Sequence, residues 1–506
     1  MALIYKKLLE VVKKYPNKIA IIQDDKKLKY SELLKIINYQ INQLAAQIPK
    51  QKKTIAILTN DFFTTLINVF ALSYLNRTII PINKGFSRSQ IQNLLVKMRV
   101  DFIITNTNFR FKSTPKIKCS FNLNHNYKQI QNQNLTIAKA DNFKNITKFL
   151  ITLTSGSTGN PKAIIFSEKT KINRFQQAVK LFTISHNDVI LNASPFSHSL
   201  GQRLTFLPLL SGATLVLLDK FNAKNWFDQV HLHKVTFTIP VSTHLHVLAE
   251  KLTQLNSGSL RLIISSSSSI NHTTKMRLIN NKFFVFGEMY GASEIGTATL
   301  IIYKKDTAEF KSVGQPCPNV KVKIKKNKKS DYAEIGEIYI KSQYAAEGYL
   351  VNNKILKISD KYGFFHTGDC GFTDENKFLY FSGRLKDVLI VGGINVFPSD
   401  IEAVLAKNKK IIQICVIGIF DDVFGDLPIA IIKSDHDRVK VESELRNLAY
   451  SKLASFQRPF KYFFVDQFPC LSSGKIDKNQ LQKMFANSLP KLGDKLLSAR
   501  DSIDSN

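Results

Sequence analysis

The chain has 506 residues and a mass of 57.4 kDa, a length that corresponds to roughly three domains of ordinary size. Hydrophobic residues make up 44% of the sequence and charged residues 22%, which is typical of a globular protein and excludes a disordered or fibrous chain. No stretch approaches about 18 uninterrupted apolar residues, so we expect no transmembrane segment, and the N-terminus lacks the long apolar core of a secretory signal.

The five cysteines lie far apart and include no Cys-x-x-Cys pair. This spacing disfavours both a disulfide framework and a zinc site, and it predicts a protein of the reducing cytoplasm.

The net charge of +32 allows two interpretations. A polyanionic partner would explain it, but the lysines are spread along the whole chain and outnumber the arginines several-fold. Proteins that read nucleic acids favour arginine and concentrate their charge on one element. The charge therefore indicates the compositional bias of an AT-rich genome, and we expect no specific nucleic-acid partner.

Short apolar runs alternate with amphipathic stretches through the first half of the chain. This alternation predicts the βαβαβ order of a doubly wound parallel sheet. In chain order we expect a strand at Thr54–Leu58, a helix at Phe62–Leu75, a strand at Thr78–Pro81, a helix at Arg88–Met98, and strands at Asp101–Thr105 and Phe149–Thr152. Further strands are expected at Thr214–Leu218, Val235–Ile239, Leu260–Ile264 and Phe283–Phe286.

Two smaller units are expected after these strands. Residues 312–381 show short strands separated by Gly and Pro turns, which predicts a small β-rich module. Beyond it, a helix at Ser399–Ala406 and strands at Gln413–Ile417 and Ile429–Lys433 predict a compact α+β segment. We therefore expect an α/β fold with a large N-terminal domain (1–384) that contains the doubly wound sheets and the β-rich module, a small mobile C-terminal domain (385–487) and a polar tail (488–506).

The segment most informative about chemistry is a loop that follows the apolar strand at Phe149–Thr152. It reads Leu-Thr-Ser-Gly-Ser-Thr-Gly-Asn-Pro-Lys over residues 153–162. Its hydroxyls, glycines and backbone N–H groups suit a polyphosphate, although the lysine does not directly follow a glycine as in a Walker loop. The candidate phosphate-binding residues are Thr154, Ser155, Gly156, Ser157, Thr158, Gly159 and Lys162.

Together with this loop, a series of further motifs resembles the adenylate-forming superfamily of acyl-CoA synthetases, peptide-synthetase adenylation domains and beetle luciferases. The resemblance spans nearly the whole chain, and the joint order and spacing of the motifs make it specific. The motifs are Tyr15-Pro-Asn-Lys-Ile-Ala20, Pro195-Phe-Ser-His198, Tyr290-Gly-Ala-Ser-Glu294, Thr367-Gly-Asp369, Gly383-Arg-Leu-Lys-Asp387 and Ser473-Gly-Lys-Ile476.

The resemblance implies that the protein activates a carboxylic acid with ATP, releases pyrophosphate and passes the acyl group to a thiol. Both reactants of the first step are anions, so a cation must lie on the developing charge, and Lys475 matches the family's lysine. Glu294 is implied to hold Mg²⁺, and His198 belongs to the segment that lines the acid pocket in relatives. The acceptor is implied to be CoA, with the phosphopantetheine of an acidic carrier protein as the alternative.

The same resemblance implies roles for several further residues. Tyr290 is expected to stack on adenine with Gly291 beside it, and the Ser293 hydroxyl to contact phosphate. Asp369 would accept the ribose hydroxyls, and Arg384 would contact ribose or phosphate. The remaining candidates are Lys386 as the hinge of the C-terminal domain, and Gly392 and Gly393 as positions where a pantetheine arm approaches the backbone.

One departure from the family concerns the acid pocket. Residues 265–269 are all serine where the family often has a Gly-Gly-Ala/Glu-Pro loop, so the sequence does not specify which acid is bound. A different class of function, a nucleic-acid or membrane-surface binder built on an inactive relative, is disfavoured because Lys475, Glu294 and Asp369 are all retained.

Overall fold

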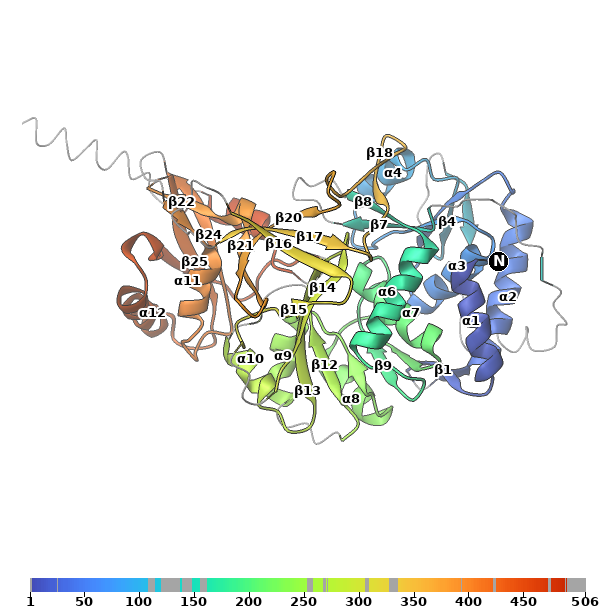
Figure 1. Cartoon of the computed structure of the whole chain (residues 1–506), viewed down its shortest axis with the longest axis horizontal. Coiled ribbons are helices and arrows are strands. Elements are labelled where there is room, and N and C mark those ends of the chain that lie inside the picture. Colours follow the sequence, from blue (N-terminus) through green and yellow to red (C-terminus); the bar gives the residue numbers. More distant parts are fainter. Residues whose placement is uncertain are drawn as a thin grey trace, which may run out of the picture.

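Two large sheets with packed helices make up most of the N-terminal part of the protein (Figure 1). The structure is a computed structural model that describes residues 2–24, 26–107, 114–119, 137–138, 148–154, 162–252, 258–266, 270, 272–304, 309–326, 335–392, 394–421, 425–471, 475–486 and 488. In these ranges, the longest apolar helices are too short to cross a membrane.

The first sheet has nine strands in the order β15-β14-β13-β12-β11-β9-β10-β1-β2. Its strands are β1 (Ile19–Gln23), β2 (Lys26–Lys29), β9 (Val189–Asn192), β10 (Thr214–Leu217), β11 (Phe237–Thr238), β12 (Leu262–Ser265), β13 (Val285–Ala292), β14 (Gly296–Ile302) and β15 (Gln315–Pro316). The six strands from β1 to β13 pair in parallel, whereas β2, β14 and β15 are antiparallel to their neighbours.

The second sheet has eight strands in the order β19-β18-β8-β7-β4-β3-β5-β6. Its strands are β3 (Thr54–Leu58), β4 (Thr78–Pro81), β5 (Phe102–Thr105), β6 (Lys116–Lys118), β7 (Leu150–Thr154), β8 (Lys162–Phe166), β18 (Gly348–Val351) and β19 (Lys354–Leu356). The strands β3 to β7 are parallel, but β7 and β8 form an antiparallel pair on either side of the predicted phosphate loop.

These pairings correct one aspect of the sequence-based expectation. The α/β class is confirmed, but both sheets are mixed rather than wholly parallel. For β1/β2, β7/β8 and β13/β14 the physical reason is the short connection, which returns the chain beside the strand it has left, whereas a parallel pair needs a long crossover. The antiparallel pairing of β18 with β8 instead joins distant parts of the chain. The correction matters for the site, since Tyr290 lies on β13, which continues to Ala292 instead of ending at Phe286 as predicted.

The helices of the N-terminal part cover and separate the two sheets. They are α1 (Leu3–Lys14), α2 (Tyr30–Gln47), α3 (Phe62–Tyr74), α4 (Arg88–Lys97), α6 (Glu168–Leu181), α7 (Ser199–Ser211), α8 (Ala223–Leu232), α9 (Ser242–Leu252) and α10 (His272–Ile279). Helix α3 is apolar and buried on almost every side, which places it in the middle of the core.

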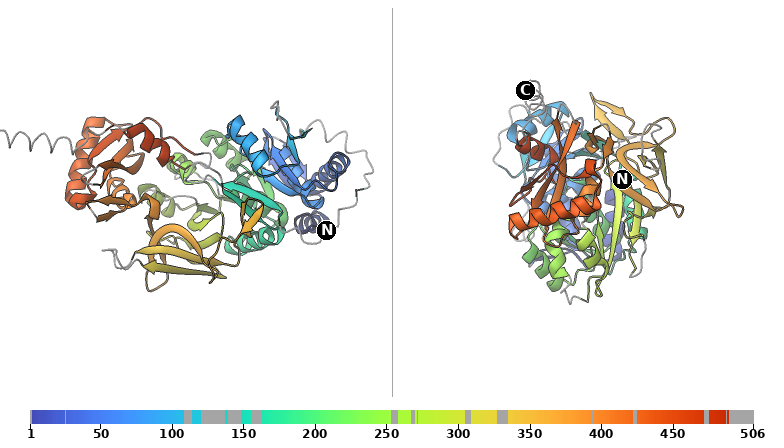
Figure 2. Two further views of the ribbon diagram at one scale, coloured as in Figure 1. Left: turned by 90° about the horizontal axis from the view of Figure 1, so that it is seen from above. Right: turned by 90° about the vertical axis from the view of Figure 1, so that its left-hand side faces the viewer.

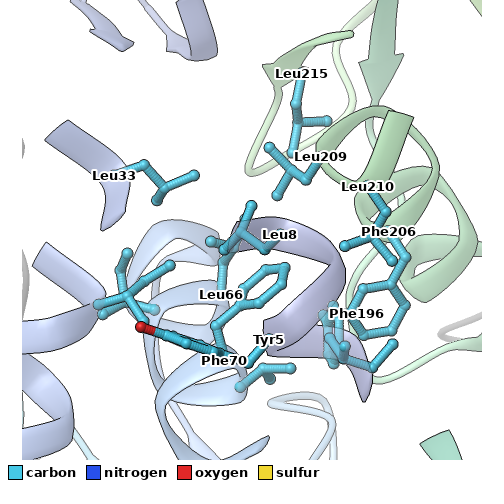
Figure 3. Close-up of a cluster of buried hydrophobic side chains, with 14 of the residues drawn as sticks. Tyr5, Leu8, Leu33, Leu66, Phe70, Phe196, Phe206, Leu209, Leu210 and Leu215 are labelled. Carbon is cyan, nitrogen blue, oxygen red and sulfur yellow. The ribbon is translucent and has the colours of Figure 1, made fainter. Parts of the chain in front are cut away.

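The largest core joins α1, α3 and α7 (Figure 3). Phe206 of α7 is the shared neighbour: its ring meets Phe70 of α3 and Phe196 edge-on, at centroid distances of 6.0 and 5.7 Å. Phe196 precedes His198 by two residues, so this aromatic packing fixes the segment that was predicted to line the acid pocket.

The β-rich module expected from residue 312 onward contains an antiparallel sheet of order β16-β17-β20-β21. Its strands are β16 (Val320–Lys326), β17 (Gly336–Ser342), β20 (Phe365–Thr373) and β21 (Leu379–Arg384). A one-turn helix, η1 (Leu385–Asp387), connects β21 to the C-terminal part.

The C-terminal part is a five-stranded sheet with helices packed on it (Figure 2). Its elements are β22 (Leu389–Val391), β23 (Ile394–Val396), α11 (Pro398–Leu405), β24 (Gln413–Asp421), β25 (Gly425–Lys433), α12 (Arg438–Lys452), η2 (Ser455–Gln457), β26 (Lys461–Phe464) and α13 (Lys478–Phe485). The predicted polar tail lies outside the described residues apart from Ser488.

The core around α3 generates a prediction about stability. Replacing Phe70, which is 0% exposed, by alanine removes the ring that packs against Phe206 and leaves a cavity. We expect the free energy of unfolding to fall by about 3–5 kcal/mol. Val96→Ala on α4 is the control, because Val96 is 62% exposed and should change stability little. Urea unfolding followed by circular dichroism measures both, and equal midpoints for the two variants would contradict the packing described.

Candidate functional site

The turn between β13 and β14 carries the predicted magnesium ligand. Gly291 pairs closely with the start of β14, where a Cβ at position 291 would come within 2.1 Å of the Gly296 carbonyl oxygen. Glycine at 291 is therefore required by the close approach of two backbones. The resulting turn presents Ser293 and Glu294 at the edge of the sheet.

A buried arginine holds this turn in place. Arg174 of α6 donates from Nη1 to the Ser293 carbonyl at 3.0 Å, from Nη2 to the Glu294 carbonyl at 3.0 Å and from Nε to the Tyr344 carbonyl at 2.8 Å. Its side chain is buried, which lowers the pKa of the guanidinium to about 9. Sequence reasoning missed Arg174; the available signal was a pair of cations, Lys171 and Arg174, one turn apart on α6.

The Glu294 side chain is anchored by a tyrosine of the second sheet. The Tyr349 hydroxyl donates to Glu294 Oε1 at 2.8 Å, and burial followed by the nearby carboxylate raises the pKa of Tyr349. The Lys162 ammonium lies 5.4 Å from the centre of the Tyr349 ring. The lysine at the end of the predicted phosphate loop and the predicted magnesium ligand therefore flank the same tyrosine.

Most of the phosphate loop itself lies outside the described residues. Ser155, Gly156, Ser157, Thr158 and Gly159 belong to that stretch. Its two ends are described: Thr154 is the last residue of β7, and its hydroxyl donates to the Lys162 carbonyl at 3.4 Å.

Asp369 lies between Tyr290 and Arg384. Its Oδ2 accepts the Tyr290 hydroxyl at 2.6 Å, and its Oδ1 lies 3.4 Å from Arg384 Nε. The pairing of β20 with β21 sets this geometry, because Asp369 and Arg384 are direct partners in the ladder. Burial raises the pKa of Asp369, while Tyr290 and Arg384 oppose that effect.

The C-terminal part contributes Lys475 to the same place. Burial, followed by the charge of Arg384, lowers the pKa of its ammonium to about 8, while Asp369 and Glu294 act in the opposite direction. Lys475 interacts electrostatically with both carboxylates, and no ion pair within 4 Å joins it to either one among the described residues. The structure therefore brings together five predicted residues from three separate parts of the chain: Tyr290, Glu294, Asp369, Arg384 and Lys475.

His198 lies deeper, at the N-cap position of α7. Its Nε2 is 3.0 Å from Asn83 Nδ2, and burial lowers the pKa of the imidazole, so the ring is neutral at pH 7. Gln202, one turn later, donates to the Thr152 hydroxyl at 3.0 Å and to the Phe196 carbonyl at 3.1 Å. Asn83 belongs to none of the motifs in the sequence, so only the fold reveals that it lies beside His198.

The predicted hinge follows the cluster directly in the chain, and the predicted thiol-binding positions come a few residues later. Lys386 is an exposed residue of η1, between β21 and the C-terminal sheet. Gly392 has a φ of +56°, a backbone conformation that favours glycine. A Cβ atom built at this position would have no other atom within 4 Å, so crowding does not require glycine here. Gly393 and the serines at 267–269 lie outside the described residues.

Comparison with protein families gives two matches in chain order. Residues 8–350 match the model of the AMP-binding enzyme family, and residues 400–475 match the C-terminal domain of AMP-binding enzymes. The chain belongs to the AMP-binding enzyme family. The resemblance inferred from the motifs is thereby confirmed.

Characterised relatives match over almost their full length. The chain is 28% identical to a 2-succinylbenzoate–CoA ligase of Bacillus pumilus, with 92% of this chain and 95% of the relative covered. It is 24% identical to an indoleacetate–CoA ligase of Aromatoleum aromaticum, with 93% and 96% covered.

Solved structures confirm the fold. The o-succinylbenzoate CoA synthetase of Bacillus subtilis, solved with an acyl-adenylate intermediate, superposes with a TM-score of 0.82 at 24% identity, covering 94% of this chain and 97% of that chain. ATP-bound MatB of Rhodopseudomonas palustris gives a TM-score of 0.83 at 22% identity, covering 96% and 99%.

The partly desolvated ammonium of Lys475 generates a prediction about its titration. We expect the lysine in the free protein to titrate with a midpoint near 8 instead of its ordinary 10.5. Adding ATP should raise that midpoint, because the phosphate charge favours the ammonium form. The measurement is NMR of protein labelled with ¹³Cε-lysine, in which the Lys475→Arg variant identifies the resonance by its loss. A midpoint at the ordinary value would mean that Lys475 lies outside the cluster.

Proposed function

We propose that this protein is an AMP-forming acyl-CoA ligase. It activates a carboxylic acid with ATP to an acyl-adenylate, releases pyrophosphate, and transfers the acyl group to the thiol of CoA. The observation that carries the proposal is the cluster in which Asp369 contacts Tyr290 and Arg384, with Lys475 electrostatically coupled to Asp369 and Glu294. The relatives described above are CoA ligases, in agreement with the acid–thiol ligase predicted from the sequence.

Lys475 is the residue to which we assign the first step. The attacking carboxylate and the α-phosphate are both anionic, and a fixed ammonium between them stabilises the charge that develops in the transition state. Desolvation lowers the pKa of Lys475, so little water competes with a substrate for the lysine. Bound anions would raise that pKa and keep the lysine in its ammonium form.

The nucleotide would be held by the carboxylate of Asp369 and the ring of Tyr290. Asp369 accepts the Tyr290 hydroxyl, so the two groups orient each other: the carboxylate toward ribose and the aromatic face toward adenine. Arg384 would balance the charge beside them. We assign phosphate contacts to Thr154, Lys162 and Ser293, together with Ser155, Gly156, Ser157, Thr158 and Gly159 of the loop.

Glu294 fits a magnesium ion. Its carboxylate is a hard oxygen ligand at a turn that Arg174 holds by two carbonyls, and Tyr349 fixes one of its oxygens. When bound, Mg²⁺ would neutralise charge on the phosphates. Arg174 and Tyr349 keep the carboxylate directed at the position where that ion is needed.

Several finer features remain part of the proposal. We place the boundary of the large domain (1–384) and the mobile C-terminal domain (385–487) at Arg384, where β21 ends and η1 begins.

Gly392 and Gly393 would lie along the path of the pantetheine arm, and His198 would lie beside the acid. We propose the cytoplasm as the location. A carrier protein as acceptor is the alternative to CoA.

The direct test of the proposal is acid-dependent ATP–pyrophosphate exchange with Mg²⁺. The acid panel contains aromatic, short, medium and long-chain acids, including 2-succinylbenzoate and indoleacetate. Lys475→Ala should lower the exchange rate by about 10²–10³, because one preorganised charge contact is lost. Thioester formation from supplied acyl-adenylate should be largely retained. Lys483→Ala, on the exposed face of α13, is the control and should leave exchange unchanged.

Two results would contradict this proposal. Absence of exchange with every acid, in folded protein, would reject the ligase activity. Equal loss of exchange and of thioester formation in Lys475→Ala would reject the role assigned to the lysine.

The hinge provides a separate prediction. One rigid arrangement cannot present both Lys475 and an incoming thiol to the same acyl centre, so we expect the C-terminal domain to turn about η1. Lys386→Pro fixes φ near −65° at that point and removes a backbone donor. We expect thioester yield, with CoA and with a holo carrier protein as competing acceptors, to fall more than pyrophosphate exchange. Lys386→Ala, which leaves the backbone free, should retain both activities; unchanged thioester yield in Lys386→Pro would contradict the rotation.

A further inference from the structure

Lys475 lies in a short segment that turns back on itself just before helix α13. Backbone bonds close this segment: the Asp477 amide donates to the Pro469 carbonyl at 2.8 Å, and the Leu471 amide donates to the Lys475 carbonyl at 2.8 Å. Helix α13 begins at Lys478, directly after its N-cap residue Asp477. Lys478 therefore follows Lys475 by three residues, at the point where the turn becomes a helix.

Lys478 forms an ion pair with the turn at the predicted hinge. Its Nζ lies 3.5 Å from Asp387 Oδ2, and both side chains are half-buried. Asp387 is the last residue of η1 and directly follows Lys386, the predicted hinge residue. Desolvation would lower the pKa of Lys478, but the charges around it, Glu402 first and Asp387 among them, raise that pKa above its ordinary value. The pair is therefore charged on both sides at pH 7.

Asp387 also interacts with the cluster on the other side of the hinge. Its charge acts on Asp369, the carboxylate assigned to the ribose, and Asp369 Oδ1 lies 3.4 Å from Arg384 Nε. Arg384 and Asp369 in turn both act on the ammonium of Lys475. Asp387 thus interacts with the nucleotide cluster and with the helix that follows Lys475.

The other attachment of the Lys475 segment is apolar. Ile476 and Leu481 pack in a cluster with side chains of β24 and β25, such as Ile417 and Ile431. Apolar packing is not directional, so it holds the segment on the sheet without fixing its orientation toward the hinge. A lysine side chain is a flexible four-carbon stem, and its ammonium reaches a defined point only if its backbone is well placed. An ion pair to the hinge turn supplies that direction.

We propose that the Asp387–Lys478 ion pair positions Lys475 for the formation of the acyl-adenylate, by tying the start of α13 to the hinge turn. This inference rests on the proposed ligase function and adds two positioning residues to it. Neither residue touches a substrate; both act through Lys475. Because the transfer to a thiol does not use Lys475, the ion pair matters for the first half-reaction and not for the second.

The first test measures both half-reactions in Asp387→Asn and in Lys478→Met. Each variant should lower kcat of pyrophosphate exchange by about 10- to 100-fold, because a small misplacement of a group in the transition state is costly, while KM for ATP and acid changes less than about threefold. Thioester formation from supplied acyl-adenylate should be retained. Lys478→Arg keeps the charge and should retain most of the exchange. Unchanged exchange, or equal loss in both half-reactions, would overturn the inference.

A double variant tests whether the ion pair acts through Lys475. Adding Lys478→Met to Lys475→Ala should lower exchange by less than about twofold more, because the group that is positioned is already absent. A full further loss would overturn the inference. The matched control is Glu442→Gln, which breaks another ion pair of the C-terminal part, between Glu442 Oε1 and Arg446 Nη2 at 2.7 Å within α12. It should leave both half-reactions unchanged.

The second test is independent of turnover and follows the Lys475 resonance by ¹³Cε-lysine NMR in Asp387→Asn without ATP. Removal of a carboxylate would by charge alone lower the titration midpoint of Lys475, whereas release of the lysine from its desolvated position should raise it from near 8 toward 10.5. We expect the rise.

The two tests separate the inference from the ligase function. A raised midpoint, with no exchange from any acid in the wild-type protein, would reject only the ligase function. A midpoint that stays or falls would overturn the inference, and exchange by the wild-type protein would then leave the ligase function standing. Absence of both the rise and the exchange would overturn both.

Discussion

The buried guanidinium of Arg174 ties together the parts of the site that the chain supplies from distant positions. By donating to the carbonyls of Ser293, Glu294 and Tyr344, it joins α6 to the β13–β14 turn and to the segment that leads into β18. Each bond is ordinary, but breaking any of them leaves a buried charged donor without a partner, which is the costly side of a hydrogen bond. The position of Glu294, and with it the proposed magnesium site, depends on this side chain together with the Tyr349 hydroxyl, which donates to the Glu294 carboxylate.

In the cluster beside the β13–β14 turn, the carboxylates and the cations stabilise one another's charges. Asp369 is buried and would favour its neutral form, but Tyr290 and Arg384 stabilise its charge. Lys475 is likewise desolvated, and the two carboxylates offset part of that effect. In such a site the arrival of a polyanion changes the balance strongly, because charges interact over a low-dielectric path. The geometry is therefore suited to respond to nucleotide and acid together.

The reacting centre and the space between α6 and α7 differ in how their cations are partnered. At the centre, Arg384 faces the carboxylate of Asp369, whereas between the helices Lys171 donates to the Gln202 side-chain oxygen and Arg203 contacts the Met289 sulfur. The aromatic packing of Phe206 against Phe70 and Phe196 fixes α7, and so the acid segment moves as one unit with the core. A surface explanation of the +32 charge does not extend to Lys171 and Arg174, which are buried.

Sequence alone determined the family, the α/β class and the position of many strands, because strands reveal themselves by local apolar runs and the motifs by local residue order. It did not predict most helices of the N-terminal part, such as α1, α2, α6 and α7. It also supplied the residues that cluster in the site, such as Glu294, Asp369 and Lys475. Only the tertiary structure decided the antiparallel edges of both sheets, the contact of Asn83 with His198, and the role of Arg174. The contacts of Asn83 and Arg174 join residues more than a hundred positions apart, and the sheet edges depend on which strands pair, so no periodicity within a segment encodes these features. Lys171 illustrates the limit: in a chain rich in lysine, burial is what distinguishes it from the many exposed lysines, and burial is a property of the fold.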